Sequence, residues 1–168
     1  MVRRATILVA LGLALASPRP APGQDSGRVT ERVAGARDTS QTYALYLPPG
    51  YTTAQRWPVL FVLDPRGRAM LGLELFRAAA ARLGWIVLSS YNTLSDGPPE
   101  PNVIALNAML VSAQARLAID TARLYLAGFS GTARAALEFA VELHGHVAGV
   151  IAAGGAVGFT TAGRRGAM

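Results

Sequence analysis

Short apolar segments alternate with longer amphipathic segments along most of the chain. Apolar segments with the length and composition of buried strands occupy residues 58–63, 85–90 and 123–128. One more small, apolar strand is expected at residues 147–153. The segments between them are rich in Ala and Leu with interspersed charges, as in helices, and they occupy residues 71–83, 102–117 and 133 to about 143. Because strands that alternate with helices form βαβ units, the pattern predicts a largely parallel sheet with helices on both faces.

The first part of the chain has a different pattern of apolar and polar residues, typical of strands with one exposed face. Residues 28–34 and 41–47 alternate between apolar and polar side chains, and the turn-like segment 35–40 lies between them. Two alternating strands joined by a short turn form an antiparallel hairpin. The predicted fold is therefore of the α/β class, with an N-terminal antiparallel hairpin attached to a mostly parallel sheet.

Ser130 stands where a predicted strand gives way to a predicted helix. Gly128 and Gly131 flank it, which is close to the Gly-x-Ser-x-Gly nucleophile elbow, although Thr132 occupies the last Gly position. A sharp strand-to-helix turn exposes the hydroxyl and sets the N–H groups of a helix start beside the reacting carbonyl. The alternative is an ordinary strand that ends in a Gly/Ser turn. The β-branched Thr132 predicts a helix start slightly further from its neighbours.

Charge and cysteine content exclude several classes of function. The basic residues are sixteen Arg and no Lys, and between residues 24 and 163 eleven Arg face ten acidic residues. The body of the chain is thus nearly neutral, so we do not expect nucleic acid as a partner in spite of the positive net charge. The chain has no Cys, which excludes disulfides, thiol nucleophiles and cysteine-held metals.

The N-terminus has the pattern of a secretory signal peptide. Arg3 and Arg4 precede an apolar run at residues 5–16, which is too short to span a bilayer, and small residues precede Gln24. We expect residues 1–23 to be the signal peptide, with a periplasmic or secreted bacterial product that meets the membrane only during export. Cleavage after Ala14-Leu15-Ala16 is a second possible site, and an uncleaved membrane anchor is the alternative to a signal peptide.

Beyond the elbow, longer strings of sequence carry a family resemblance. They are Tyr-Leu-Pro-Pro-Gly-Tyr at 46–51, Pro-Val-Leu-Phe-Val-Leu-Asp at 58–64, Gly-Trp-Ile-Val-Leu-Ser-Ser at 84–90 and the stretch 120–131. With them the chain resembles the α/β-hydrolases, in the bacterial secreted esterase branch that includes feruloyl-esterase-like and polyhydroxybutyrate-depolymerase-like proteins.

The resemblance implies a domain organisation and a chemistry. Residues 24–155 would form a partial α/β-hydrolase domain that lacks its C-terminal third after the sixth strand, and residues 156–168 would form an irregular tail. The elbow would follow the fifth strand, and Ser130 would form an acyl-enzyme with a small-molecule or polymeric ester. No organic cofactor and no metal would be required.

The resemblance also implies an oxyanion hole. One N–H would come from Gly131, and the other from the loop after the third strand, where Arg66 is the candidate because Pro65 has no N–H. A simple turn held by Asp64 is the alternative for that loop. The next loop contains Asn92, Ser95 and Asp96, of which Asn92 and Asp96 are candidate substrate contacts. An ordinary polar turn explains these residues as well.

The sequence after Ser130 contains few groups that could complete a catalytic triad. The acids are Glu138 and Glu142, and the histidines are His144 and His146. Glu138, Glu142 and His144 lie on or at the end of the helix that follows the elbow, and because a helix rises about 1.5 Å per residue, His144 is far from Ser130. His146 begins the next strand at the opposite edge of the sheet, so it is no nearer. We therefore expect the 168-residue chain to be an inactive fragment. A non-catalytic, hydrolase-like binding module is the alternative function.

The signal-peptide prediction can be tested by expression in a bacterial host with export. Mass spectrometry of the exported protein should identify Gln24 as the N-terminal residue, because the small residues before it fit the signal peptidase site. Soluble cytoplasmic protein that retains Met1 would contradict the prediction.

Overall fold

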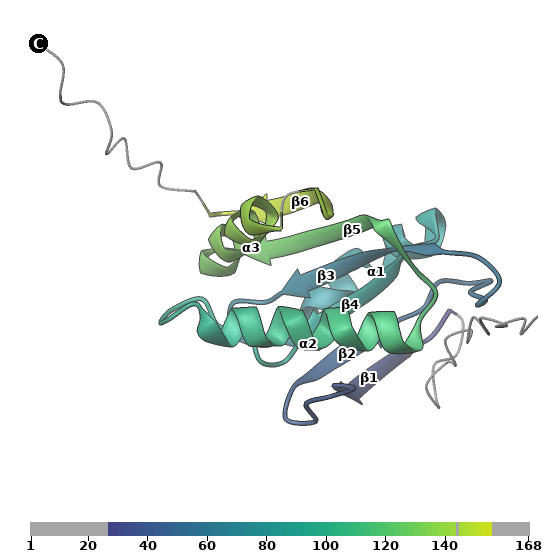
Figure 1. Cartoon of the computed structure of the whole chain (residues 1–168), viewed down its shortest axis with the longest axis horizontal. Coiled ribbons are helices and arrows are strands. Elements are labelled where there is room, and N and C mark those ends of the chain that lie inside the picture. The colour runs from purple at the N-terminus through teal and green to yellow at the C-terminus, as the bar shows by residue number, and fades with distance from the viewer. Residues whose placement is uncertain (1–26, 144, 156–168) are drawn as a thin grey trace, which may run out of the picture.

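The computed structural model describes residues 27–143 and 145–155, which build one six-stranded sheet with helices on both faces (Figure 1). The predicted signal peptide at 1–23 and the predicted tail at 156–168 lie outside these residues. The elements in chain order are β1 (Val29–Ala34), β2 (Thr42–Tyr46), β3 (Trp57–Leu63), α1 (Ala69–Leu83), β4 (Ile86–Ser90), α2 (Glu100–Arg116), β5 (Ile119–Phe129), α3 (Gly131–Glu142) and β6 (Val147–Ala153). None of these helices is long and apolar enough to cross a bilayer.

The sheet has the strand order β1-β2-β4-β3-β5-β6. β1 pairs with β2 and β2 with β4 in antiparallel fashion, whereas β4, β3, β5 and β6 run parallel to one another. The predicted class is thereby confirmed: a mostly parallel sheet that begins with an antiparallel hairpin. Because the four parallel strands share one direction, the loops that follow them gather at one edge of the sheet.

Two apolar cores, one on each face, hold the helices to the sheet. On one face, α2 and α3 pack on inward side chains such as Phe61, Leu88 and Leu126. On the other face, α1 packs on Leu60, Val62 and their neighbours. Figure 1 shows α2 and α3 on the same side of the sheet. β3 is buried along its whole length, as its uninterrupted apolar run predicts.

The boundaries of the elements confirm the sequence prediction at the end of α1 and differ from it at the start of β5. Gly84 ends α1 in the left-handed conformation, with φ 69°, as a glycine after a helix predicts. β5 begins at Ile119, earlier than its apolar run indicates. Asp120 lies in this early part of β5. Its Oδ1 accepts the Ala122 N–H at 3.0 Å, where the register of β5 against β3 shifts, so local turn chemistry persists inside the strand.

The two edge strands of the described sheet differ in chemistry. β1 carries Glu31 and Arg32 and has a register shift against β2, and charges and bulges of this kind discourage pairing with another chain. β6 has the sequence Val-Ala-Gly-Val-Ile-Ala-Ala, without a charge. Its residue Ile151 is 46% exposed. Ile151 also borders an apolar cavity of about 130 Å³ beside α1. β6 is therefore the edge that can recruit another strand.

We expect the isolated chain to be oligomeric or poorly soluble because of this uncharged edge. A charge at the edge, as in Ile151→Lys, should shift the sedimentation profile toward monomer. Leu75→Lys is the matched control, since Leu75 is a 60% exposed leucine of α1 that does not border the cavity. A monodisperse, cooperatively melting monomer of the unmodified chain would contradict the prediction.

Candidate functional site

The turn between β5 and α3 holds Ser130 in a backbone conformation that residues with a side chain seldom adopt. Ser130 has φ 55° and ψ −127°, and no other non-glycine residue of the described chain has a positive φ. Such a conformation costs roughly 1–3 kcal/mol. Hydrogen bonds hold it: the Ser130 N–H donates to Ala153 O at 2.8 Å, and the Ser130 carbonyl accepts the Ala133 N–H at 3.0 Å. The residue is exposed at the carboxyl edge of the sheet, which presents a hydroxyl to solvent.

Glycine is required on both sides of Ser130 by close backbone approach. A Cβ at Gly128 would meet the backbone of Thr132 and would lie 2.7 Å from the nitrogen of Ala133. A Cβ at Gly131 would meet both the carbonyl oxygen and the hydroxyl of Ser95. The Gly-x-Ser-Gly part of the motif therefore follows from the sharpness of the turn.

Thr132, which departs from the usual motif, is part of the support of the elbow. The residue is fully buried, with 0% of its surface exposed. Its hydroxyl donates to Leu63 O at 2.6 Å and accepts the Phe129 N–H at 3.1 Å. Because Leu63 is the last residue of β3, this hydroxyl ties the start of α3 to the neighbouring strand. The motif position of Thr132 gave no sign of this bond.

The loop between β3 and α1 is organised around the buried carboxylate of Asp64. Its Oδ1 accepts the N–H groups of Arg66 and Arg68, at 2.9 and 3.0 Å, and the Arg68 guanidinium lies against both carboxylate oxygens. The Asp64 carbonyl accepts the Gly67 N–H at 3.2 Å. The N–H of Arg66, the candidate oxyanion donor, is thus engaged by Asp64, and the side chain of Arg66 is exposed.

These contacts also set the ionisation of Asp64. Burial raises the pKa of Asp64, but hydrogen bonds from the Arg68 side chain and from the backbone N–H groups of Arg68 and Arg66 outweigh burial and hold the pKa below its ordinary value. Asp64 is therefore ionised at neutral pH. The stability that it contributes is lost as the pH falls through this lowered pKa.

The loop after β4 brings Ser95 between the elbow and the β3–α1 loop. The Ser95 N–H donates to Pro65 O at 2.8 Å, and the Ser95 hydroxyl accepts the Gly131 N–H at 3.0 Å. The N–H of Gly131, the other candidate oxyanion donor, therefore points at a hydroxyl oxygen. In the sequence, the only signal for Ser95 was its place in a polar loop at the carboxyl edge.

The two candidate substrate contacts of this loop have different surroundings. The side-chain amide of Asn92 accepts the Thr42 N–H at 2.9 Å and donates to Ser40 O at 3.4 Å. Both ends of the amide are thus used to fasten the loop to the β1–β2 hairpin. Asp96 is exposed, and its carboxylate has no hydrogen-bond or ion-pair partner among residues 27–143 and 145–155.

No hydrogen bond joins the Ser130 hydroxyl to a base in the part of the chain that the structure describes. His146 directly precedes β6, and the register pairs Leu124 with Val147, so His146 belongs to the amino edge of the sheet. Ser130 lies six residues beyond Leu124, or about 20 Å along the strand. Glu138 forms an ion pair with Arg134 on the surface of α3, at 3.3 Å. His144 falls outside the described residues.

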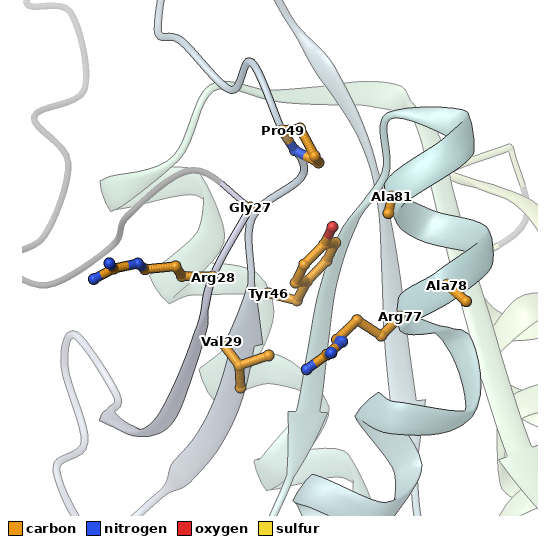
Figure 2. Close-up of a pocket in the computed structure, with 8 residues that line it drawn as sticks. All are labelled: Gly27, Arg28, Val29, Tyr46, Pro49, Arg77, Ala78 and Ala81. Atoms are coloured by element: carbon orange, nitrogen blue, oxygen red, sulfur yellow. The ribbon is translucent and has the colours of Figure 1, made fainter.

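Three cavities of the described chain have no lining residue in the elbow. The one with the greatest volume of these three, about 550 Å³, lies between the β1–β2 hairpin and α1. Figure 2 shows the Tyr46 ring in this space and the Arg77 side chain reaching into it from α1. Arg77 is already paired with Glu74 at 3.1 Å. A cavity of about 210 Å³ separates α2 from α3, and Glu142 is its only ionisable lining residue. The described residues contain no cluster of three or more potential metal ligands.

Comparisons with known proteins bear on the fold. No protein-family model and no curated protein sequence matches the chain. Among solved structures, a thermostable esterase is similar over 74% of this chain and 40% of its own, with 16% identity and a TM-score of 0.58. The S-formylglutathione hydrolase of Agrobacterium tumefaciens is similar over 66% of this chain and 50% of its own, with 15% identity and a TM-score of 0.53.

A third similar structure is EstE1, a thermostable carboxylesterase cloned from a metagenomic library. It is similar over 76% of this chain and 46% of its own, with 14% identity and a TM-score of 0.55. The chain thus spans half or less of each of these proteins, and at such identities the likeness concerns the fold. The described residues share the fold of the matched part of these esterases and hydrolases.

The role of Thr132 can be measured through stability. Thr132→Val keeps the shape of the side chain but leaves Leu63 O and the Phe129 N–H without their partner, and a buried group left unsatisfied costs about 1–3 kcal/mol. Urea unfolding should show a loss in this range. Thr132→Ser, which keeps the hydroxyl, is the matched control and should lose less. Equal stability of the Val variant and the unmodified chain would show that the hydroxyl does not support the elbow.

Proposed function

We propose that this protein is a serine hydrolase, exported to the periplasm or secreted, that cleaves carboxylic esters through an acyl-enzyme on Ser130. The observation that carries the proposal is the conformation of Ser130: it is an exposed serine with positive φ at a strand-to-helix turn on the carboxyl edge of a parallel sheet. Backbone conformations of this energetic cost cluster at functional sites, which favours a role for the exposed Ser130 hydroxyl in function.

The chemistry begins with the Ser130 hydroxyl. Its oxygen attacks the ester carbonyl carbon while its proton passes to a base, and the carbonyl π electrons move to the carbonyl oxygen as an oxyanion. The tetrahedral intermediate then expels the alcohol and leaves an acyl group on Ser130. Water releases the acyl group in a second step that needs the same base. A small-molecule or polymeric ester is the substrate, and the mechanism calls for no cofactor.

Among residues 27–143 and 145–155, no base or orienting acid is hydrogen-bonded to the Ser130 hydroxyl. His146 and Ser130 belong to opposite edges of the sheet, and a base must come within about 3 Å of the hydroxyl that it deprotonates. We therefore propose that the 168-residue chain does not turn esters over by itself. The Ser130 hydroxyl is exposed at the elbow, but no base removes its proton.

A second function is a hydrolase-like binding module without catalysis. The same missing base favours it, together with the engagement of the Gly131 N–H by Ser95 at 3.0 Å. The two functions differ in one property: only a nucleophile forms a covalent bond with an electrophilic probe.

The test supplies the missing base from solution. We expect the chain to show no Ser130-dependent hydrolysis of p-nitrophenyl acetate or butyrate. With added imidazole as base, a fluorophosphonate probe should attach to Ser130, because fluoride is a good leaving group and only deprotonation is lacking. Peptide mass spectrometry would locate the adduct, and Ser130→Ala should lack it.

Two outcomes would contradict the proposal. No adduct on Ser130 at any imidazole concentration would favour the binding module. Ester turnover that is lost in Ser130→Ala and also in His144→Ala or His146→Ala would show that the chain supplies its own base.

A further inference from the structure

The space in front of the Gly131 N–H is occupied by a hydroxyl group. The Ser95 oxygen lies 3.0 Å from the Gly131 nitrogen and accepts its hydrogen, which is the distance at which an oxyanion would lie from such a donor. A hydroxyl can accept and donate at the same time. The Ser95 hydroxyl donates no hydrogen bond to any residue that the structure describes. Next to the backbone N–H of Gly131, the elbow therefore has a second donor, which is the Ser95 hydroxyl that this N–H contacts.

The β3–α1 loop offers no backbone donor in this arrangement. The N–H groups of Arg66 and Arg68 are bound by the Asp64 carboxylate, and that of Gly67 by the Asp64 carbonyl. Pro65 has no N–H. An oxyanion at Ser130 must therefore find a donor elsewhere, and the Ser95 hydroxyl is placed for it.

Ser95 is held in place by its own loop. Its N–H donates to Pro65 O at 2.8 Å. The preceding residue, Leu94, is bound on both its N–H and its carbonyl by the side chain of Asn102, each at 2.9 Å. Thr93 donates from its hydroxyl to Asp64 O at 2.8 Å. A donor fixed in this way before the reaction requires little reorganisation when charge develops.

We propose that the Ser95 hydroxyl is a catalytic residue that donates to the oxyanion formed at Ser130. This inference rests on the proposed function of Ser130. As Ser130 Oγ bonds to the carbonyl carbon, the π electrons pass to the carbonyl oxygen, and the Ser95 O–H donates to that oxygen. The Gly131 N–H remains on Ser95 Oγ and polarises the hydroxyl, which makes it a stronger donor. The N-terminus of α3 adds a favourable potential for the negative charge.

The alternative is that Ser95 blocks the site. In that case its hydroxyl would have to leave before substrate could reach the Gly131 N–H, and its removal would speed the reaction. The two roles predict opposite effects of the same substitution, Ser95→Ala. That substitution leaves the backbone bond from Ser95 to Pro65 O unchanged.

The experiment measures the rate at which a fluorophosphonate labels Ser130 in the full chain with imidazole present, since the phosphoryl oxygen takes the place of the oxyanion. Ser95→Ala should lower this rate about 100-fold, as removal of one oxyanion donor does. Ser95→Thr, which keeps a hydroxyl, should restore most of it. Ser90→Ala is the matched control, because it removes a hydroxyl that accepts the Asn92 N–H in the same loop, at 2.9 Å, and should label like the unmodified chain.

The outcomes separate this proposal from the function on which it rests. An unmodified chain without an adduct on Ser130 overturns both. An adduct that forms equally fast in Ser95→Ala and in the unmodified chain overturns the role of Ser95 alone, and a faster adduct shows that Ser95 blocks the site. An equal loss of rate in Ser90→Ala would assign the effect to the loop and also overturn the proposal.

Discussion

The positive φ of Ser130 is the constraint on which the surrounding structure depends. A residue with a Cβ keeps φ 55° only if its neighbours fix the backbone more strongly than the conformation costs. Three elements do so here: β6 accepts the Ser130 N–H through Ala153 O, α3 begins directly after the turn, and the Thr132 hydroxyl binds the end of β3. The same requirement explains why Gly128 cannot carry a side chain. The central strands and the elbow are thus one structural unit, because β3, α3 and β6 together fix the backbone conformation of Ser130.

The carboxyl edge of the sheet is a second unit, built from polar contacts between loops. Asp64 organises the loop after β3, and the loop after β4 is fastened to it by Thr93 and Ser95. Ser95 then reaches the elbow through the Gly131 N–H. Loops on a sheet edge are usually the most variable part of a fold, yet here three of them share hydrogen bonds. Such sharing is what a site needs in order to present groups to a reacting atom without reorganisation.

The faces of the sheet carry the apolar cores, and its two edge strands differ in charge. The two apolar cores fix the strand order and so decide which loops become neighbours. β1 is protected by charge and irregular register, whereas β6 is bare of charge. The strand that accepts the Ser130 N–H is thus also the least protected strand. Any element that pairs with β6 would therefore lie close to the elbow, since a Cβ added at Gly155, just after β6, would lie 2.6 Å from the Ser130 carbonyl oxygen.

The sequence by itself determined the secondary structure and its class. The apolar run at residues 58–63 predicted a buried strand, the run at 147–153 predicted a further strand, and the glycines around Ser130 predicted a sharp turn after the strand that ends at Phe129, because these signals are local in the chain. It could not determine that the Arg66 N–H is held by Asp64 or that Thr132 binds Leu63 O, nor could it place the Ser95 hydroxyl on the Gly131 N–H. The last two contacts join residues far apart in sequence, and strand order alone makes them neighbours. The first depends on how a loop closes on a buried carboxylate, which several local conformations allow, so only the tertiary structure decided them.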